Sequence, residues 1–167
     1  MDSQIRLAEL TDIPDLCYVH KMTWLHTYPN DGCGIYESDI LEKDFSSNKR
    51  VEAWTKRICD QSGRIWVAEV EGRVVAFCEV KFQPINNLLE AIYILPKFQK
   101  QGIGKLMCEE AICWLGGEKP IELQVAKYNN GAINFYKKLG FKEQVYEIKP
   151  YLLPNGKNIP LIAMIRF

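Results

Sequence analysis

Hydrophobic residues recur along the chain with two different spacings, and each spacing predicts its own type of element. Apolar residues three or four positions apart predict helices, whereas alternating or β-branched runs predict strands. The expected helices run from Thr11 to before Tyr28 and over about 47–60, 103–115 and 130–139. The expected strands cover about 5–10, 64–70, 73–82, 88–95, 120–126, 141–148 and 159–167. This order of elements predicts a mixed α/β domain.

Two connecting segments carry signals of their own. Glu71-Gly72 separates two strand-like runs and is a good tight-turn pair, which predicts an antiparallel hairpin over 64–82. The segment 28–47 is rich in Pro, Asn, Asp, Gly and Ser, which predicts a loop with room for a helical turn.

With 167 residues, the chain is long enough for one well-buried core and too short for two ordinary domains, so we expect a single domain over 1–167. The net charge is zero, which gives no basic excess for nucleic acid and no polybasic tract for a membrane surface. No stretch approaches the roughly 18 to 20 apolar residues of a membrane span. A soluble, cytoplasmic protein is therefore expected.

The cysteines and histidines predict no metal site. Six cysteines are scattered along the chain without a Cys-x-x-Cys pair, which favours free, buried thiols over a disulfide framework. His20 and His26 have no Cys, Asp or Glu at metal-ligand spacing, so packing or surface roles are favoured over ligation.

A glycine loop lies between a strand and a helix. The apolar strand stops at Pro96, Gly102 and Gly104 follow, and helical spacing starts at Ile103. Glycines let the backbone approach a ligand closely, and the helix start adds the positive end of its dipole, so N–H groups can converge on a phosphate. A Walker loop needs a different spacing and a Lys-Ser/Thr pair, and a dinucleotide fingerprint needs a third glycine where Met107 stands. The loop therefore predicts an anion site of another type.

Two motifs carry a resemblance to a known family. The first is Gln-x-x-Gly-x-Gly over 99–104, and the second, over 129–141, matches Asn-x-x-Ala-x-x-Phe-Tyr-x-x-x-Gly-Phe. With both motifs in order, the chain resembles the GNAT superfamily of acetyl-coenzyme A dependent N-acetyltransferases, specifically from about 90 to 141. The resemblance implies the GNAT fold, in which a central, mostly antiparallel mixed sheet is splayed between its fourth and fifth strands and flanked by helices.

The same resemblance implies acetyl-CoA as cosubstrate. Backbone N–H groups of the loop would take the coenzyme A pyrophosphate, and main-chain groups at the end of the preceding strand would pair with the pantetheine arm and polarise the thioester carbonyl. The loop residues are Gln99, Lys100, Gln101, Gly102, Ile103, Gly104 and Lys105, and the strand residues are Tyr93, Ile94 and Leu95. Asn129 matches an asparagine that contacts the pantetheine, although a helix N-cap is an equally favoured role.

Catalytic roles follow from the resemblance as well. Tyr136 matches the general acid that protonates the departing thiolate, with simple packing as the alternative. Glu90 is the first choice for the general base, because many family members carry a working glutamate on this strand, and Glu79 on the neighbouring strand is the second. Relatives that acetylate the N-terminal alanine of a ribosomal protein have a glutamate where this chain has Gln124, which cannot act as a base.

The expected function is acetyl transfer to a primary amine by direct attack in a ternary complex. A small cationic amine such as a polyamine is the expected acceptor, because carboxylates and aromatic rings occur together in the segment that the resemblance assigns to the acceptor site. These residues are Asp31, Glu37, Asp39, Glu42 and Asp44, with Trp24, Tyr28 and Tyr36. A solvated acidic loop is the alternative interpretation.

Two other functions stay open. A peptide or protein N-terminus is the runner-up acceptor, since it also presents an amine. A non-catalytic acyl-CoA-binding module is the alternative from another class, and retention of Tyr136 favours catalysis over it. The expected partners are thus a small-molecule amine or a peptide N-terminus, without nucleic acid or membrane, and a homodimer is one option for assembly.

Overall fold

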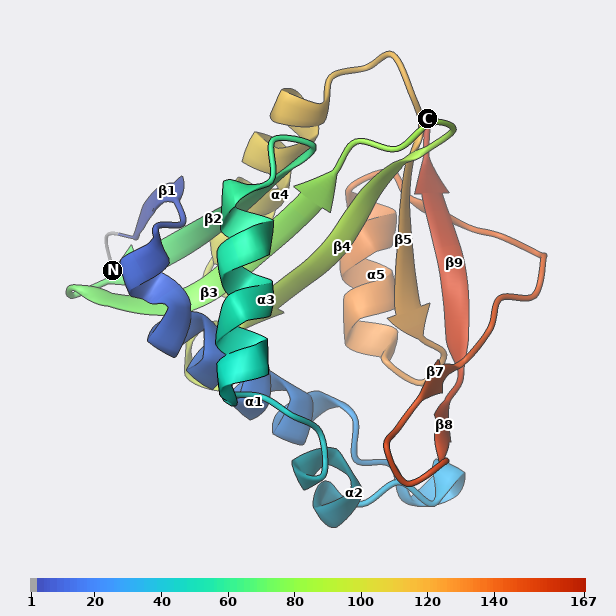
Figure 1. Cartoon of the computed structure of the whole chain (residues 1–167). Helices are drawn as coiled ribbons and strands as arrows, with labels where there is room; N and C mark the ends of the chain where they lie inside the picture. The colour runs from blue at the N-terminus through green and yellow to red at the C-terminus, as the bar shows by residue number, and fades with distance from the viewer. Residues whose placement is uncertain (1–2) are drawn as a thin grey trace.

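The computed structural model describes residues 3–167 (Figure 1). Its helices are α1 (Ile13–Thr27), α2 (Glu37–Leu41), α3 (Asn48–Cys59), α4 (Ile103–Leu115) and α5 (Asn130–Lys138). Its strands are β1 (Gln4–Leu7), β2 (Gly63–Val70), β3 (Arg73–Lys81), β4 (Asn87–Ile94), β5 (Ile121–Ala126), β6 (Lys142–Glu143), β7 (Tyr151–Leu152), β8 (Asn158–Ile159) and β9 (Leu161–Arg166). All the expected helices are present, and α2 is the helical turn expected within 28–47.

Seven strands form one sheet in the order β1-β2-β3-β4-β5-β9-β6, and all neighbours are antiparallel except β4 and β5. β4 and β5 pair only at Asn87–Ile121 and Leu88–Glu122, after which they diverge (Figure 1). The expected splay between the fourth and fifth strands is therefore confirmed. Glu71 and Gly72 both have a positive φ in the β2–β3 hairpin, as a turn of this type requires.

Helices cover both faces of the sheet (Figure 1). α1 and α3 lie on one face, where Leu16, Trp54 and Phe77 are buried together. α4 and α5 lie on the other face, where Met107 and Tyr136 belong to a second buried cluster. Because helices cover both faces, nearly every residue of β2 and β3 is buried, which explains their continuous apolar runs.

The first helix and α3 differ in detail from the prediction. α1 begins at Ile13 after a 3-10 turn over Leu10–Asp12, with Asp12 rather than Thr11 at its N-cap position. In α3, apolar spacing predicts that Val51 and Trp54 both face inward; Trp54 is buried, but Val51 is exposed. The inward stripe of α3 instead includes Arg50 and Arg57, which line a cavity together with Trp54. Hydrophobic spacing alone could not identify a stripe that contains two arginines.

The strand expected over 141–148 is much shorter in the structure. Only Lys142 and Glu143 pair with β9, and Val145 is fully exposed beyond the sheet edge. An unexpected hairpin of β7 and β8 follows, in a segment where Pro154-Asn155-Gly156 predicts a loop between the last two strands. Its residues Leu153 and Ile159 are buried in a third cluster with Trp24 of α1, Ile40 of α2 and Phe45. The hairpin therefore covers the end of α1 beside the splayed strands.

An ion-pair cluster fixes β1 and the start of α1 to β2. Arg6 donates from Nη1 to Asp12 Oδ2 (2.7 Å) and from Nη2 to Asp12 Oδ1 (2.9 Å), and it also contacts Glu69 at 3.1 Å. The Glu9 N–H donates to Asp12 as well (2.8 Å). The hydrogen bonds from Arg6 are the largest cause that holds the pKa of Asp12 below its usual value, and the bond from the Glu9 N–H adds to this effect.

Because the folded-state pKa of Asp12 is depressed, its contribution to stability is present above the unfolded pKa and is lost as pH falls through the folded pKa. We expect Asp12→Asn to lower the free energy of unfolding by about 1–3 kcal/mol at pH 7. The difference from wild type should shrink below about pH 4. Urea denaturation at both pH values measures this. Asp15→Asn, exposed on the same helix, is the matched control and should change stability by less than about 0.5 kcal/mol; equal effects of the two variants would contradict the role of Asp12.

Candidate active site

The edge of β4 that faces β5 is open beyond Leu88. The Leu95 N–H donates to the Val75 carbonyl (2.9 Å), so in this register the backbone groups of Leu95 and Tyr93 point toward β3. The Leu95 carbonyl also accepts from the Phe98 N–H (2.8 Å). By alternation, the N–H groups of Ile92 and Ile94 point across the gap toward β5. Of the three strand residues predicted to contact the cofactor arm, only Ile94 presents its N–H to the gap, and Ile92 adds a second.

The glycine loop presents a row of free N–H groups. Lys100 and Gly102 both adopt left-handed conformations (φ 60° and 90°), which turns successive N–H groups toward one side. The N–H groups of residues 100–105 donate no hydrogen bond within the described part of the chain, 3–167. They lie at the start of α4, where the helix dipole adds positive potential. The loop is therefore suited to bind a phosphate group.

Two glutamine side chains stabilise this loop by hydrogen bonds to backbone carbonyls. Gln99 Nε2 donates to the Ile94 carbonyl (3.0 Å), and Gln101 Nε2 donates to the Lys97 carbonyl (2.9 Å). Gly104 has a packing role, because a Cβ there would lie 3.0 Å from Ile94 Cδ1 and 3.3 Å from Phe135 Cζ. The two glutamines of the motif thus hold the loop, and Gly104 lets α4 approach β4 and α5.

The second motif places Asn129 and Tyr136 on α5. Asn129 is the N-cap of this helix, and its Oδ1 accepts from the Ala132 N–H (3.1 Å). Tyr136 is buried between Phe135 and Phe141, yet its hydroxyl makes no hydrogen bond within residues 3–167. Burial raises the pKa of Tyr136 well above its ordinary value. A buried tyrosine hydroxyl usually has a partner, so this one is available to a ligand.

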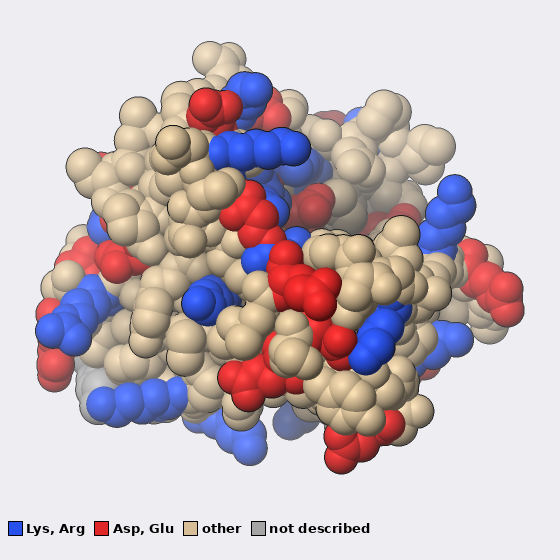
Figure 2. All heavy atoms as spheres, turned by 60° about the horizontal axis from the view of Figure 1, so that its bottom comes forward, with Lys and Arg blue, Asp and Glu red and all other residues tan. Residues whose placement is uncertain are grey.

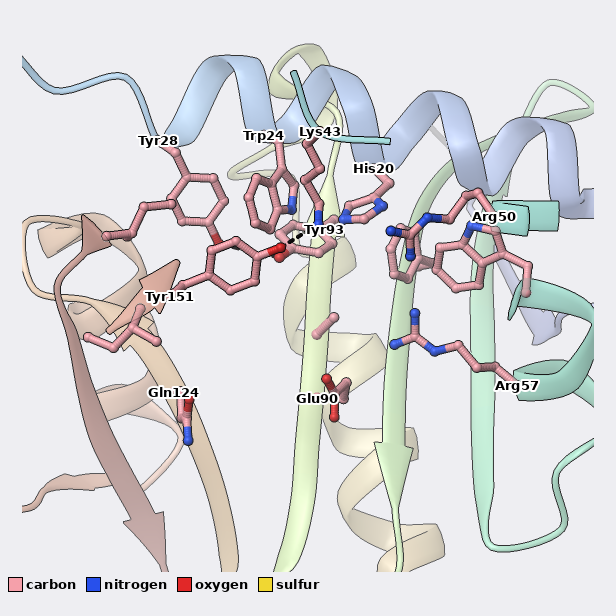
Figure 3. A pocket seen from close by; sticks show the side chains of 15 residues that line it. His20, Trp24, Tyr28, Lys43, Arg50, Arg57, Glu90, Tyr93, Gln124 and Tyr151 are labelled. Carbon is pink, nitrogen blue, oxygen red and sulfur yellow. Dashed lines mark hydrogen bonds between the residues drawn. The ribbon is translucent and has the colours of Figure 1, made fainter. Parts of the chain in front are cut away.

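A cavity of about 270 Å³ lies on the opposite face of the sheet, beneath α1 and α3 (Figure 3). Aromatic side chains form much of its wall, and two of them, Tyr28 and Tyr93, have hydroxyl oxygens 3.3 Å apart. The labelled ring-bearing residues are His20, Trp24, Tyr28, Tyr93 and Tyr151. Gln124 of β5 also lines the cavity, so the cavity reaches both strands that border the gap.

The charges in this cavity differ from those expected. Lys43, Arg50 and Arg57 line it, and among residues 3–167 Glu90 is the one carboxylate that does so. None of the acidic residues predicted for the acceptor lines it. Asp39 is held by Lys157 Nζ (2.7 Å) and Asn155, and the Asp44 carboxylate bonds to Ser47 at the start of α3. Asp39 and Asp44 thus have structural roles, and the cavity is lined by more cations than carboxylates.

The two candidate bases have different environments. Ala91 lies opposite Glu79 and Leu89 opposite Val80, which leaves Glu90 as the extra residue of a β-bulge. Glu90 is about one-third exposed, lines the cavity and lies 3.7 Å from Lys81 Nζ. It is therefore accessible to a molecule bound in the cavity.

Glu79 is buried and ion-paired. Its Oε1 accepts from Arg57 Nε (2.7 Å), its Oε2 pairs with the same guanidinium, and Lys81 Nζ lies 3.3 Å from Oε1. Burial raises the pKa of Glu79, and the charge of Arg57 opposes this shift. Glu79 does not line the cavity, so its role is to hold Arg57.

Several cavity residues carried no signal in the sequence. Lys43 and Arg50 are isolated charges in polar segments, and Tyr151 lies in a hairpin that was not predicted. For His20 the sequence predicts a packing or surface role, and its ring contacts Trp24, Phe45 and Tyr93 at centroid distances of 5.5, 5.1 and 5.5 Å. Burial lowers the pKa of His20 to about 3, and nearby positive charges add to this effect. His20 is therefore neutral at physiological pH.

The outer surface mixes charges of both signs. Figure 2, with the bottom of Figure 1 turned forward, shows Lys and Arg interspersed with Asp and Glu over this face. Across residues 3–167, His, Cys, Asp and Glu side chains form no group of three or more that could hold a metal ion. In the same part of the chain, no helix is both long and apolar enough to cross a membrane.

Comparisons with known proteins agree on one family. A family model described as an acetyltransferase (GNAT) domain matches residues 61–143. An uncharacterised N-acetyltransferase of Methanocaldococcus jannaschii is 35% identical over 94 residues, covering 51% of this chain and 41% of that protein. A spermidine N(1)-acetyltransferase of Thermoplasma acidophilum is 26% identical over 148 residues, covering 85% of this chain and 89% of that protein. An N-alpha-acetyltransferase of Sulfurisphaera tokodaii is 24% identical over 175 residues, covering 96% of this chain and 91% of that protein. The chain spans about half the length of several curated relatives that it matches.

Solved structures show the same likeness over the whole chain. The PaiA N-acetyltransferase of Thermoplasma acidophilum, in complex with coenzyme A, has a TM-score of 0.76, 25% identity and 99% coverage of both chains. The ribosomal-protein-S18-alanine N-acetyltransferase of Escherichia coli has a TM-score of 0.72 at 22% identity, covering 99% of this chain and 93% of that one, and so shares the fold. With the family model, both sequence motifs and the splayed sheet in agreement, the chain belongs to the GNAT acetyltransferase family.

Proposed function

We propose that this protein is an N-acetyltransferase that moves the acetyl group of acetyl-CoA to a primary amine by direct attack in a ternary complex. The observation that carries this proposal is the row of free N–H groups at residues 100–105, next to the open edge of β4. Unpaired backbone donors are costly when they are removed from water, so a phosphate ligand would stabilise them. The cosubstrate and the acceptor would then enter the gap from opposite faces of the sheet.

The cosubstrate would bind mainly through the backbone. The N–H groups of 100–105 would take the pyrophosphate, and the N–H groups of Ile92 and Ile94 would face the pantetheine arm and the thioester carbonyl. An N–H donor at that carbonyl stabilises the oxyanion that develops as the amine attacks. Asn129 is already used as a helix cap through its Oδ1, which leaves its amide N–H₂ for a contact with the arm.

The acceptor amine must lose its proton before it attacks. With a reference pKa near 10.4, deprotonation at neutral pH costs roughly 4 to 5 kcal/mol. Glu90 is the carboxylate that the bulge turns into the cavity, and it would take this proton directly or through water. Glu79 is less suited to the role, because Arg57 and Lys81 already occupy its carboxylate.

Tyr136 would act on the leaving group. Its pKa lies well above 10, whereas a thiol has a reference pKa near 8.5, so full proton transfer to a free thiolate is uphill. Donation of a hydrogen bond to the sulfur as the C–S bond breaks does not carry this cost. We therefore assign Tyr136 mainly to stabilisation of the developing thiolate charge. A domain that only senses acyl-CoA would need neither this hydroxyl nor Glu90.

A small amine is the acceptor class that the cavity volume favours, because about 270 Å³ is at the lower end for ligand sites. A cationic acceptor such as a polyamine draws support from the relative named as a spermidine acetyltransferase, and a peptide N-terminus from the one named as an N-alpha-acetyltransferase. The acidic residues that motivated a polyamine lie outside the cavity, which weakens that choice. Acetyl-CoA-dependent thiol release with a panel of amines tests the activity.

Two glycines at opposite ends of α4 test the cosubstrate site. Gly102 (φ 90°, ψ −17°) and Gly116 (φ 74°, ψ 180°) both have a positive φ, and a Cβ at either would meet no heavy atom within 4 Å. Alanine at Gly102 should cost roughly 1–2 kcal/mol of stability, and alanine at Gly116 should cost at least as much, because its φ and ψ lie in a region that is essentially restricted to glycine, so both variants are first checked for folding. Gly102→Ala should weaken coenzyme A binding about ten-fold or more, because its Cβ would occupy space needed by the phosphates. Gly116→Ala should leave the affinity unchanged, and calorimetry showing equal affinities in the two folded variants would remove the site from this loop.

Tyr136→Phe tests the leaving-group role. Since the hydroxyl makes no hydrogen bond within residues 3–167, its removal should hardly affect stability. Turnover should fall about ten- to a thousand-fold, with acetyl-CoA affinity nearly intact. Single-turnover rates and calorimetry separate these effects, and Tyr18→Phe, exposed on α1, is the control. A wild-type chemical rate in Tyr136→Phe would return Tyr136 to a packing role.

Glu90→Gln tests the base. Activity should fall most at low pH, where little of the acceptor amine is neutral, and should recover partly as pH rises toward about 10. The measurement is the pH profile of kcat/KM. Glu79→Gln is the comparison, which should lower stability but preserve the shape of the profile. The opposite pattern would exchange the roles of the two glutamates.

A further inference from the structure

Two cations in the cavity have no carboxylate partner in the described part of the chain. Arg57 pairs with Glu79, and Lys81 pairs with both Glu79 and Glu90. Lys43 and Arg50 form no ion pair with any residue in the described range 3–167. Charges in a half-enclosed cavity are normally paired, because burial removes part of their hydration. This pair of cations therefore has the charge that an anionic ligand group would balance.

The aromatic wall already holds a cation of its own. Lys43 Nζ lies 4.6 Å from the ring centroid of Trp24 and 5.0 Å from that of Tyr151, and it bonds to the Tyr151 hydroxyl. Cation–π attraction that would hold a cationic acceptor is thus used by Lys43. A second cationic group placed there would be repelled by the first.

Unused hydrogen-bond donors lie around the same two cations. Trp24 Nε1, on a residue that is 95% buried, has no acceptor in the described part of the chain. Arg50 uses only Nε, which donates to the Asp44 carbonyl (3.1 Å), so its two terminal nitrogens are free among residues 3–167. Figure 3 shows Lys43 and Arg50 entering the cavity from the helical side and Glu90 lying on the β4 side. Donors and positive charge therefore lie on one side, and the candidate base on the other.

We propose that the acceptor is a small amino acid, an inference that rests on the proposed function. Its carboxylate is bound by Arg50, Lys43 and Trp24 Nε1, and its amine lies toward Glu90. A guanidinium with two free terminal nitrogens is suited to a planar carboxylate, which it can bind at both oxygens. The cavity volume fits one such molecule rather than a longer chain. The neutral state of His20, imposed by burial and by the charges of Lys43, Arg50 and Arg57, agrees with a positive field in the cavity.

Matched acceptors test this charge preference. The probes are the common amino acids, their C-terminal amides, the corresponding amines without the carboxylate, aminoalkyl phosphates, short peptides and spermidine, with acetyl-CoA as donor. At least one amino acid should exceed its own amide and amine about ten-fold or more in kcat/KM. Amides, amines or spermidine used as well as amino acids would overturn the proposal. A preference for peptides or for aminoalkyl phosphates would also overturn it and would identify the other acceptor.

Arg50→Gln tests the residues, with the adjacent Lys49→Gln as matched control, because Lys49 is exposed on the same helix and does not line the cavity. Arg50→Gln should raise KM for the preferred amino acid about ten-fold or more and should abolish its advantage over the amide. Affinity for acetyl-CoA should be unchanged, and Lys49→Gln should behave as wild type in every assay. An advantage that survives in both Arg50→Gln and Lys43→Gln, each checked for folding, would contradict this assignment.

The amino acid proposal and the proposed acetyltransferase activity can be rejected separately. If acetyl-CoA is used but the favoured amines lack a carboxylate, the amino acid proposal falls and the acetyltransferase activity stands. If no amine in the panel accelerates thiol release, the proposed function itself falls, and with it the acceptor assignment.

Discussion

The site depends on the parting of β4 and β5. The two strands share only two residue pairs, so most of the β4 edge is left without a strand partner in the middle of the sheet. Unpaired backbone groups at such a position are costly unless water or a ligand satisfies them. The rest of the molecule keeps the gap open: α5 packs behind it, the bulge at Glu90 turns a carboxylate toward one face, and the glycine loop begins where β4 ends.

The two faces of this gap have different chemistry. The α4 side offers backbone donors and a tyrosine hydroxyl that has no partner within the described residues, which suits phosphates and a leaving thiolate. Among residues 3–167, the α1 and α3 side offers aromatic rings, one accessible carboxylate and two cations that have no carboxylate partner. Under the proposed function, a cosubstrate held largely by main-chain groups would require little of the side chains, and the other face would be free to determine which amine is used.

The sequence predicted those features that residues close together in the chain determine. Period, caps and turn residues predicted the helices, the β2–β3 hairpin and the glycine loop, because nearby residues determine these features. It failed where packing between distant segments decides. The β7–β8 hairpin is stabilised by burial of Leu153 and Ile159 against α1 and α2, and Arg50 points inward because α3 lies over the cavity. Acidic residues near aromatic residues in the sequence suggested a cationic acceptor, yet the fold commits Asp39 and Asp44 to other contacts.

The most direct test of the central claim is an NMR titration of the ¹⁵N-labelled protein with coenzyme A. The largest amide shift changes should occur at residues 100–105 and at Ile92 and Ile94, because these N–H groups would gain partners on binding. Amides of β1 and β2 should hardly move. Saturable changes that are confined to other segments, with residues 100–105 unaffected, would contradict the claim that the splayed strands and the loop form the coenzyme A site.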